Sequence, residues 1–308
     1  MAGHQPALSK ESIELLQPRP GGVFVDATLG GGGHALALLE RIRPDGRLLG
    51  VDRDPAAIVR VRERLAGFAP APVLVRANFA DLEVVAREAG FEAVDGVLFD
   101  LGVSSFQLDD PSRGFSFRAD GPLDMRMDPD APVGAADLVN RSDQRELARL
   151  IRRLGEERWA GRIADFIVRR RPLRTTRDLA AAVEAAIPRG AWPKDIHPAT
   201  RTFQALRMAV NDELDSLEAG LRAAISILKP GGRMAAISFH SLEDRVVKAL
   251  ITAESVDCIC PPQQPVCTCA HRATLKAVTR KPITPAAAEL AANPRARSAK
   301  LRVAERLS

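Results

Sequence analysis

Short apolar runs alternate with amphipathic stretches along the first hundred residues of the chain. Four apolar runs are typical of buried parallel strands and occupy residues 23–26, 47–52, 73–77 and 94–100. The stretches between them have helical periodicity and occupy residues 34–43, 55–66 and 80–89. Asp54 and Pro55 are typical of a helix start, because an aspartate caps free N–H groups and proline has none to leave unpaired. This alternation predicts an α/β fold with a parallel sheet.

The alternation then stops and the chain becomes helical in pattern. A connection rich in glycine, proline, aspartate and serine occupies residues 109–132. Helical patterns follow at residues 142–153, 156–171, 176–186 and 198–217. Strand-like runs return at residues 233–239, 275–279 and 300–305. Because a structureless segment of that length is improbable in a compact domain, we predict a core of residues 1–108 and 212–308 with an inserted helical domain at 109–211.

Composition restricts the classes of protein that the chain can represent. Its 308 residues are 46% hydrophobic and 27% charged, which is typical of a globular protein. No apolar run approaches the ~20 residues of a membrane-spanning helix, and the first residues lack the layout of a signal peptide. We therefore expect cytoplasmic residence and no membrane partner, whereas the pattern favours no particular oligomeric state.

The distribution of basic side chains suggests a polyanionic partner. The formal net charge is +5, although arginine abundance also accompanies a GC-rich genome. Two clusters stand out, Arg169, Arg170 and Arg171 in one run, and Arg295, Arg297, Lys300, Arg302 and Arg306 near the C-terminus. Clustered arginine and lysine are typical of phosphate contacts, and a solvated charged face is the alternative.

Two glycine-bearing segments carry most of the functional information. The first, V-F-V-D-A-T-L-G-G-G-G-H at residues 23–34, is a strand that runs into a glycine turn at a helix start. Backbone N–H groups of Gly32, Gly33 and His34 can meet an anionic group there, unless the turn is merely tight. The second, L-K-P-G-G-R-M-A-A-I-S-F at residues 228–239, is a helix end, a turn and a strand. As a pair they resemble the Rossmann-like S-adenosylmethionine-dependent methyltransferases.

Three further residues stand at the ends of predicted strands. Asp52 ends the second strand about 20 residues after the glycines, where a carboxylate accepts bonds from both hydroxyls of a ribose. Phe79 follows the third strand, and its ring is either a wall for an adenine or part of the core. Asp100 ends the fourth strand, where open α/β sheets bind ligands, and a buried structural aspartate is the alternative.

Longer motifs match a single family nearly end to end. They are L-G-V-S-S-F-Q-L-D-D, R-G-F-S-F, D-G-P-L-D-M-R-M-D-P, H-P-A-T-R-T-F-Q-A-L-R-M-A-V-N-D-E-L, S-F-H-S-L-E-D-R and N-P-R-A-R-S-A-K-L-R-V-A-E-R. With them the chain resembles the bacterial 16S ribosomal RNA cytosine-N4 methyltransferase family (RsmH, formerly MraW). The resemblance implies a Rossmann-like class I S-adenosylmethionine-dependent methyltransferase core with an inserted α-helical substrate-recognition domain. It also implies N4-methylation of a cytidine in 16S rRNA of the small ribosomal subunit, near the decoding centre.

The resemblance also assigns residues to the cofactor. Carried over position by position, the contacts to S-adenosylmethionine fall at Gly32, Gly33, His34, Asp52, Phe79, Asp100 and Gln107. Gln107 rests on the resemblance alone, and the other six also follow from the residues themselves. Cytosine's amino nitrogen is a poor nucleophile because its lone pair is delocalised, so an acceptor for one amino hydrogen would assist transfer. We expect Asp100 to be this catalytic acceptor, with Asp124 as second candidate and cofactor binding alone as the alternative for Asp100.

Two groups of side chains are candidates for contact with RNA. Arg201, Gln204, Arg207 and Asn211 share one face of a predicted helix, opposite an apolar stripe. That face is either an RNA contact or a hydrogen-bonded seam between domains. Phe115 and Phe117 are candidates to stack on a splayed base, with a place in the core as the alternative.

The chain's four cysteines lie within one segment, C-I-C-P-P-Q-Q-P-V-C-T-C, at Cys258, Cys260, Cys267 and Cys269. Metal binding outranks disulfides in the expected compartment, yet C-x-C pairs are tighter than the usual spacing of zinc ligands. A bound metal, reduced thiols in a proline-rich loop and a redox pair are therefore all open. We assign no metal to the methyl-transfer site.

Two other functions compete with methyl transfer. A nicotinamide-dependent oxidoreductase uses the same glycine turn but gives no reason for the K-P-G-G strand. A non-catalytic RNA-binding or assembly factor would be expected to lose the glycine turn, Asp52 or Asp100, and all three are intact.

Overall fold

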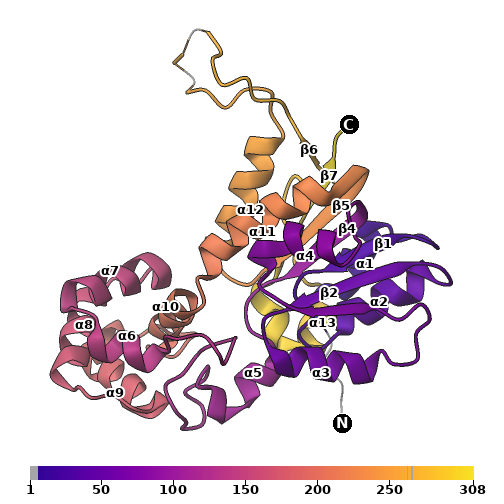
Figure 1. Cartoon of the computed structure of the whole chain (residues 1–308). Coiled ribbons are helices and arrows are strands. Elements are labelled where there is room, and N and C mark those ends of the chain that lie inside the picture. Colours follow the sequence, from indigo (N-terminus) through magenta and orange to yellow (C-terminus); the bar gives the residue numbers. More distant parts are fainter. Residues whose placement is uncertain (1–5, 262, 265) are drawn as a thin grey trace. The chain divides into compact units, whose positions relative to one another are not determined.

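The computed structural model describes residues 6–261, 263–264 and 266–308. It comprises two compact units, one of Met1–Gly102 with Leu214–Ser308 and the other of Val103–Glu213. The second unit thus begins at Val103 rather than at residue 109 and ends at Glu213 rather than at residue 211. In Figure 1 the colours from magenta to pink mark this unit, and indigo and orange mark the parts of the first unit that precede and follow it in the sequence.

The first unit is built on a seven-stranded sheet. Its strands are β1 (Val23–Asp26), β2 (Arg47–Asp52), β3 (Val73–Arg76), β4 (Val94–Asp100), β5 (Leu228–Ser238), β6 (Leu275–Ala277) and β7 (Lys300–Arg306). They lie in the order β3-β2-β1-β4-β5-β7-β6, with β1 to β5 parallel and β7 antiparallel to both neighbours. The chain turns from one side of β1 to the other after β3. The carboxyl ends of β1 and β4 therefore flank the switch point at which open α/β sheets bind ligands.

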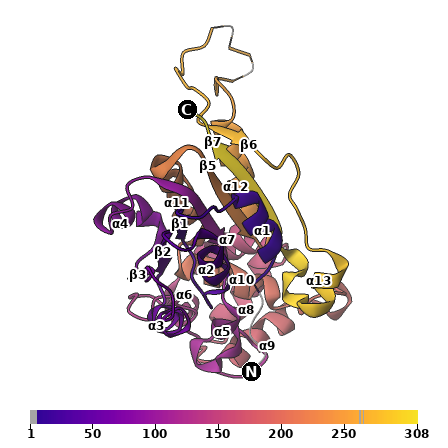
Figure 2. The same ribbon diagram turned by 90° about the vertical axis from the view of Figure 1, so that its right-hand side faces the viewer.

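Helices cover both faces of this sheet (Figure 2). They are α1 (Ser9–Leu16), α2 (Gly33–Ile42), α3 (Pro55–Arg64), α4 (Leu82–Glu88), α11 (Glu213–Ile227), α12 (Ser241–Glu254) and α13 (Ala287–Ala292), with 3₁₀ turns η1 (Phe79–Asp81) and η4 (Pro294–Ser298). Because side chains alternate along a strand, Phe24 packs with α1, α2 and α3, whereas Val25 packs with α4, α11 and α12. Burial on both faces explains why the strands read as continuous apolar runs.

The second unit is helical and has an apolar core of its own. Its helices are α5 (Ser105–Asp109), α6 (Ala135–Arg141), α7 (Gln144–Gly155), α8 (Ala160–Arg169), α9 (Thr176–Ala186) and α10 (Thr200–Val210), with 3₁₀ turns η2 (Pro111–Arg113) and η3 (Arg189–Ala191). Leu147, Ile163, Leu179 and Leu206 are fully buried, and they join α7, α8, α9 and α10 into one cluster. Between residues 103 and 213 the structure contains no strand, only an isolated bridge between Pro122 and Thr175.

Several predicted boundaries are wrong for local reasons. The helix predicted at 198–217 is two helices, because Asp212 adopts a left-handed conformation (φ 47°) between α10 and α11. The helix predicted at 156–171 begins only at Ala160, since Glu156 also has positive φ (49°) and ends α7. Strand β5 starts at Leu228, but its pairing with β4 slips before Arg233, where the Pro-Gly-Gly turn lies. The sequence reading also missed α1, α6, α12 and α13.

Candidate active site

The glycine turn connects β1 to α2 and approaches its neighbours closely. Gly32 is the N-cap of α2 and has φ 74°, a region that favours glycine. A Cβ atom there would lie 2.9 Å from Cγ2 of Val61, so the position excludes a side chain on steric grounds as well. The first N–H groups of α2, at Gly33 and His34, have no acceptor within their own helix. They are therefore donors for an anionic ligand group.

Asp52 at the end of β2 is tied to this turn through both carboxylate oxygens. Its Oδ2 accepts the N–H of Gly30 at 2.8 Å, and its Oδ1 accepts the N–H of Asp54 at 2.9 Å. Burial raises the pKa of Asp52, and these two backbone hydrogen bonds oppose the rise. Each oxygen keeps a second lone pair, so the side chain can still accept hydroxyl donors. The adjacent Asp54 caps α3, where it accepts the N–H of Ala56 at 3.0 Å, as predicted.

Asp100 at the end of β4 has one open acceptor. Its backbone N–H donates to the hydroxyl of Thr28 at 2.6 Å, which joins the end of β4 to the segment after β1. Its Oδ2 lies 3.4 Å from Nε2 of His34. Its Oδ1 is buried and has no hydrogen-bond partner among the described residues. A buried acceptor without a partner costs free energy, and a bound donor would remove that cost.

Asp26, which the sequence reading did not select, joins Asp52 and Asp100 at the carboxyl ends of the parallel strands. We call these three residues the acidic edge. It is fully buried at the end of β1, and its Oδ1 accepts the N–H of Thr28 at 3.1 Å. Its Oδ2 has no partner in the described part of the chain. Burial raises the pKa of Asp26 to about 6, against a lowering influence of His34. The available signal was its position, since Asp26 ends a strand just as Asp52 and Asp100 do.

His34 on the first turn of α2 lies among these carboxylates. Burial alone would lower its pKa, but the nearby Asp100 carboxylate and the charge of Asp26 outweigh that and raise it. Asp26 and Asp100, at the ends of β1 and β4, thus act directly on this imidazole, and Asp52, at the end of β2, acts on Asp26. An edge with this excess of acidic groups favours a ligand that carries positive charge.

Phe79 in η1 follows β3 and is partly buried. Its ring meets that of Phe99 edge to face, with centroids 5.8 Å apart. A Cβ on Gly220 of α11 would lie 2.6 Å from the ring, so glycine is what lets the helix approach. The ring has core contacts and an accessible part, and both interpretations of Phe79 are compatible with this packing.

Gln107 lies in the second unit, on α5. Its Oε1 accepts the N–H of Ser104 at 3.0 Å while its own N–H donates to the hydroxyl of Ser104 at 3.2 Å. This capping box accounts for a glutamine at the third position of the helix. Its contact with the cofactor stays a prediction.

The polar face of α10 is mostly engaged inside the second unit. Arg207 forms two bonds of 2.7 Å with Glu213. Asn211 donates to the carbonyl of Met125 and accepts the N–H of Met127, each at 2.7 Å. These bonds show that Arg207 and Asn211 hold the helical unit together from within, whereas Arg201 is exposed.

Phe115 and Phe117 are part of the core of the same unit. Phe115 is 6% exposed, and Phe117 packs against His197 and Phe203 at centroid distances of 4.5 and 4.9 Å. This packing favours the core alternative for both rings, and their contact with a base stays a prediction.

Asp124, the second candidate acceptor, is paired. Arg126 binds both of its oxygens, with Nε 2.9 Å from Oδ1 and Nη2 2.7 Å from Oδ2. Burial opposes ionisation, but these hydrogen bonds and the charge of Arg126 lower the pKa of Asp124.

Most of the clustered basic residues have internal partners too. Arg169 pairs with Asp165, Arg170 donates to a backbone carbonyl at 2.9 Å, and Arg171 donates to two carbonyls at 2.7 and 2.6 Å. Arg302 is 8% exposed and binds Asp244, which Lys300 also approaches at 3.5 Å. These residues stabilise the fold, whereas Arg297 is exposed.

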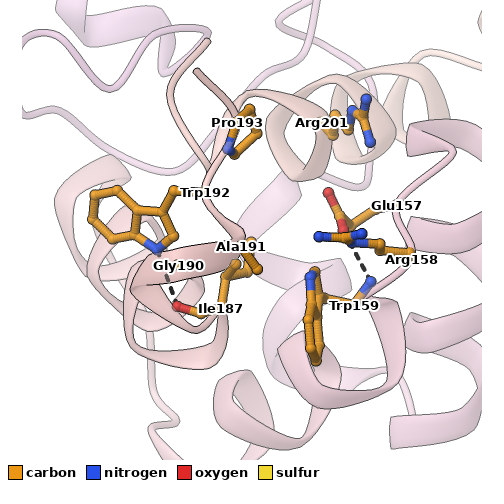
Figure 3. Close-up of a pocket in the computed structure, with 9 residues that line it drawn as sticks. All are labelled: Glu157, Arg158, Trp159, Ile187, Gly190, Ala191, Trp192, Pro193 and Arg201. Carbon is orange, nitrogen blue, oxygen red and sulfur yellow. Dashed lines mark hydrogen bonds between the residues drawn. The ribbon is translucent and has the colours of Figure 1, made fainter. Parts of the chain in front are cut away.

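The second unit contains a pocket of about 360 Å³ that the sequence reading did not identify (Figure 3). Its lining residues are Glu157, Arg158, Trp159, Ile187, Gly190, Ala191, Trp192, Pro193 and Arg201. Both tryptophans of the chain are among them. Figure 3 shows two hydrogen bonds that fix the walls, from Trp192 Nε1 to the carbonyl of Ile187 (3.0 Å) and from the N–H of Trp159 to Glu157 (2.9 Å).

The pocket combines aromatic and cationic groups. Arg158 lies over the ring of Trp159 at 5.5 Å, and Arg189 lies over the ring of Trp192 at 5.4 Å. The indole nitrogen of Trp159 is buried without a partner among the described residues. Indole rings and guanidinium groups together are suited to planar, anionic ligands such as nucleotides. Only the spacing of the two tryptophans, 33 residues apart, was visible in the sequence, and spacing does not reveal that both line one pocket.

The fold and the acidic edge define the class of the protein. Compared with a dinucleotide-binding sheet of order 3-2-1-4-5-6, an antiparallel strand, β7, is inserted between β5 and the edge strand. With the glycine turn and the strand-end carboxylates, this is the arrangement of a Rossmann-like methyltransferase.

The chain belongs to the MraW methylase family, whose model matches residues 1–307. This confirms the resemblance found in the motifs: the protein is a methyltransferase, and its methyl donor is S-adenosylmethionine. It is 55% identical over 307 residues to the ribosomal RNA small subunit methyltransferase H of Geobacter sulfurreducens, with 99% of each chain covered. It is 50% identical to the protein of that name from Heliobacterium modesticaldum, with 99% of this chain and 98% of that one covered.

A solved structure described as a putative rRNA-methylase from Clostridium thermocellum aligns with 99% of each chain, at 11% identity and a TM-score of 0.48. Across the part of the chain that the structure describes, no helix has the length and apolar character needed to cross a membrane.

Proposed function

We propose that the enzyme transfers a methyl group from S-adenosylmethionine to N4 of a cytidine in 16S rRNA of the small ribosomal subunit, near the decoding centre, in the cytoplasm. The family and the names of relatives at 50–55% identity support the ribosomal substrate. The observation that carries the proposal is the buried, unpartnered Oδ1 of Asp100 at an acidic edge beside a helix start.

Each part of S-adenosylmethionine has a suitable group at this edge. The helix-start N–H groups of Gly33 and His34 suit its carboxylate. The Asp52 carboxylate suits the ribose hydroxyls, and Phe79 and Gln107 complete the proposed contacts. Asp26 and Asp100 suit its positively charged groups, because a cation satisfies buried acceptors that have no donor in the described chain.

The acidic edge also argues against a dinucleotide. A pyrophosphate carries two negative charges, which Asp26 and Asp100 beside the glycine turn would repel. An amino-acid group with both an ammonium and a carboxylate satisfies the helix start and the acidic residues together. The charge of the edge therefore favours the methyl donor over a nicotinamide cofactor.

S-adenosylmethionine supplies an electrophilic methyl group, and the protein's own work is alignment and proton handling. Well-oriented reactants gain up to ~7–11 kcal/mol from alignment. Asp100 has the open oxygen required to accept a hydrogen bond from the cytosine amino group and later its proton. We therefore assign it the catalytic role as well as a cofactor contact.

The helical unit is the proposed substrate-recognition domain. Its pocket of tryptophan and arginine side chains suits a base and its phosphate better than the core rings of Phe115 and Phe117 do. If phosphate contacts contribute, affinity for RNA falls steeply with added salt. A salt-independent affinity would contradict this part of the proposal.

The decisive experiment uses small ribosomal subunits from a strain that lacks the enzyme. Incubation with the purified protein and S-adenosylmethionine is followed by nuclease digestion and nucleoside mass spectrometry. N4-methylcytidine is the expected product. The appearance of 5-methylcytidine, or of no methylated cytidine on any assembly intermediate, would overturn the assignment.

A further inference from the structure

The four cysteines lie on a long arm between α12 and β6, which Figures 1 and 2 show extending away from the sheet of the first unit. Hydrogen bonds fix the base of the arm. The N–H of Thr274 donates to the carbonyl of Glu254 at 2.8 Å, and His271 Nε2 lies 2.9 Å from the carbonyl of Ala253. None of the proposed cofactor contacts lies on this arm.

The outer part of the arm has no apolar core among its described residues. Val256, Ile259 and Val266 are 42%, 54% and 68% exposed. Burial of apolar side chains therefore does not explain how the two cysteine pairs are held together. Another interaction has to offset the entropy of ordering the segment.

The sulfur atoms nevertheless converge. All four Sγ atoms lie within 4.8 Å of one another. Cys267 and Cys269 are 3.6 Å apart, and Cys269 and Cys258 are 3.9 Å apart. A disulfide requires about 2.05 Å. Four sulfurs bound tetrahedrally at about 2.3 Å from one zinc ion are about 3.8 Å apart, which matches both distances.

Backbone donors are directed at the sulfurs in a reciprocal pattern. The residue inside the first pair, Ile259, donates its N–H to Cys269 Sγ at 3.5 Å. The residue inside the second pair, Thr268, donates its N–H to Cys260 Sγ at 3.5 Å. N–H donors of this kind stabilise thiolate over thiol and orient a ligand toward a metal. Each C-x-C turn thus supports a sulfur of the other.

We propose that Cys258, Cys260, Cys267 and Cys269 bind one structural Zn²⁺ ion that holds the arm together. Four S–H bonds break on binding, their protons pass to solvent, and four Zn–S bonds form, so no oxidant or reductant is needed. Tetrahedral thiolate sites select zinc or iron–sulfur centres, and sulfurs this close enclose a single ion rather than a cluster. The site is closed, since all four positions are filled by protein.

Metal analysis of the full-length protein tests the proposal. Protein purified without chelator and dialysed against zinc-containing and then zinc-free buffer is expected to hold about one zinc per chain. Cys258→Ser combined with C260S, C267S and C269S is expected to hold almost none. Ile259→Ala, which keeps all four thiols and the backbone donors, is the matched control and should hold as much zinc as the unchanged protein. Cobalt in place of zinc should show thiolate charge-transfer and tetrahedral d–d bands.

A measurement on the unchanged protein covers the case in which the serine variant does not fold. Trypsin cleavage at the exposed Arg272 is expected to become at least about tenfold faster when a chelator removes the metal. Absence of zinc above the level of the serine variant would overturn the proposal. Iron in place of zinc, disulfides detected by intact mass, or cleavage that a chelator does not accelerate would each overturn it as well.

Discussion

Charged and amide side chains at the sheet edge and on α10 differ in how completely they are paired. At the edge, Asp26 Oδ2 and Asp100 Oδ1 are buried without partners among the described residues. On and beside α10, Arg207 and Asn211 bind Glu213 and the backbone of Met125 and Met127. The sequence does not show this difference, since it gives only aspartates at strand ends in one region and charged and amide residues at helical spacing in the other.

We propose that this difference separates residues that serve the fold from residues that bind a ligand. A paired group has its free energy of burial offset inside the protein. An unpaired one is held in a costly state by the surrounding structure, which is typical of a functional position. The comparison therefore assigns chemistry to the edge and stability to α10.

The sharpest test of this contrast is Asp100→Asn. The amide keeps the shape of the side chain but cannot take up a proton, so kcat is expected to fall about 100- to 1000-fold. Initial rates at saturating S-adenosylmethionine and small subunits give kcat, and calorimetry checks that cofactor still binds.

Asp165→Asn is the control, because that carboxylate pairs with Arg169 on the surface of α8. It should leave kcat unchanged. If Asp100→Asn binds the cofactor normally and keeps wild-type turnover, Asp100 is not the catalytic acceptor. If Asp124→Asn loses turnover instead, Asp124 is that acceptor.

The next largest effect concerns stability at Asp26. Its pKa is raised from 3.8 to about 6, so the folded state holds a proton that the unfolded state releases. Stability therefore decreases as pH rises between about 4 and 6 and stays lower above that range, by up to about 3 kcal/mol. Asp26→Asn should remove this loss. We expect it to gain about 1–3 kcal/mol at pH 7.5, the lower value arising because the charge of Asp26 also supports His34.

Urea denaturation at several pH values measures this gain. Arg207→Met is the comparison variant on α10. It leaves the buried Glu213 carboxylate without this arginine, so the free energy of unfolding should fall by about 3 kcal/mol. If Asp26→Asn destabilises as Arg207→Met does, Asp26 belongs with the structural residues and the contrast fails there.

The smallest effect is expected for Asp52→Asn. Each carboxylate oxygen of Asp52 accepts one backbone N–H group. An asparagine has only one acceptor oxygen, so one of these two bonds is lost, together with the charge-assisted bonds to the ribose. The Kd for S-adenosylmethionine should rise about tenfold, or about 1.4 kcal/mol. Calorimetry checks this, with Glu83→Gln, which alters an exposed ion pair in α4, as control. An unchanged Kd would show that Asp52 does not contact the cofactor.

Much of the first unit could be predicted because its signals are local. Parallel strands buried on both faces give uninterrupted apolar runs, and β1, β2 and β4 begin and end where predicted. Asp54 before Pro55 is a strong start signal, and α3 starts there. By contrast, α12 has His240 as its N-cap, which is not among the usual capping residues, and the helix was missed.

What the sequence could not supply depends on contacts between distant residues. Nothing local distinguishes the open Asp100 from the paired Asp124, because the pairing of Asp124 depends on where Arg126 folds. Asp212, which divides α10 from α11, has a left-handed conformation that the sequence does not signal, because the residue is not a glycine. The tryptophan pocket likewise arises from tertiary packing between separate helices.

The sheet order has a consequence for how the protein is made. Strand β7 lies between β5 and β6, so the sheet of the first unit is incomplete until residues up to Arg306 have left the ribosome. The helical unit is contiguous, and its core is complete once Glu213 has emerged. Domains fold as units during synthesis, earlier parts first. The inserted helical unit can therefore fold before the sheet is complete, and that sheet has no antiparallel neighbour for β5 until β7 has been made.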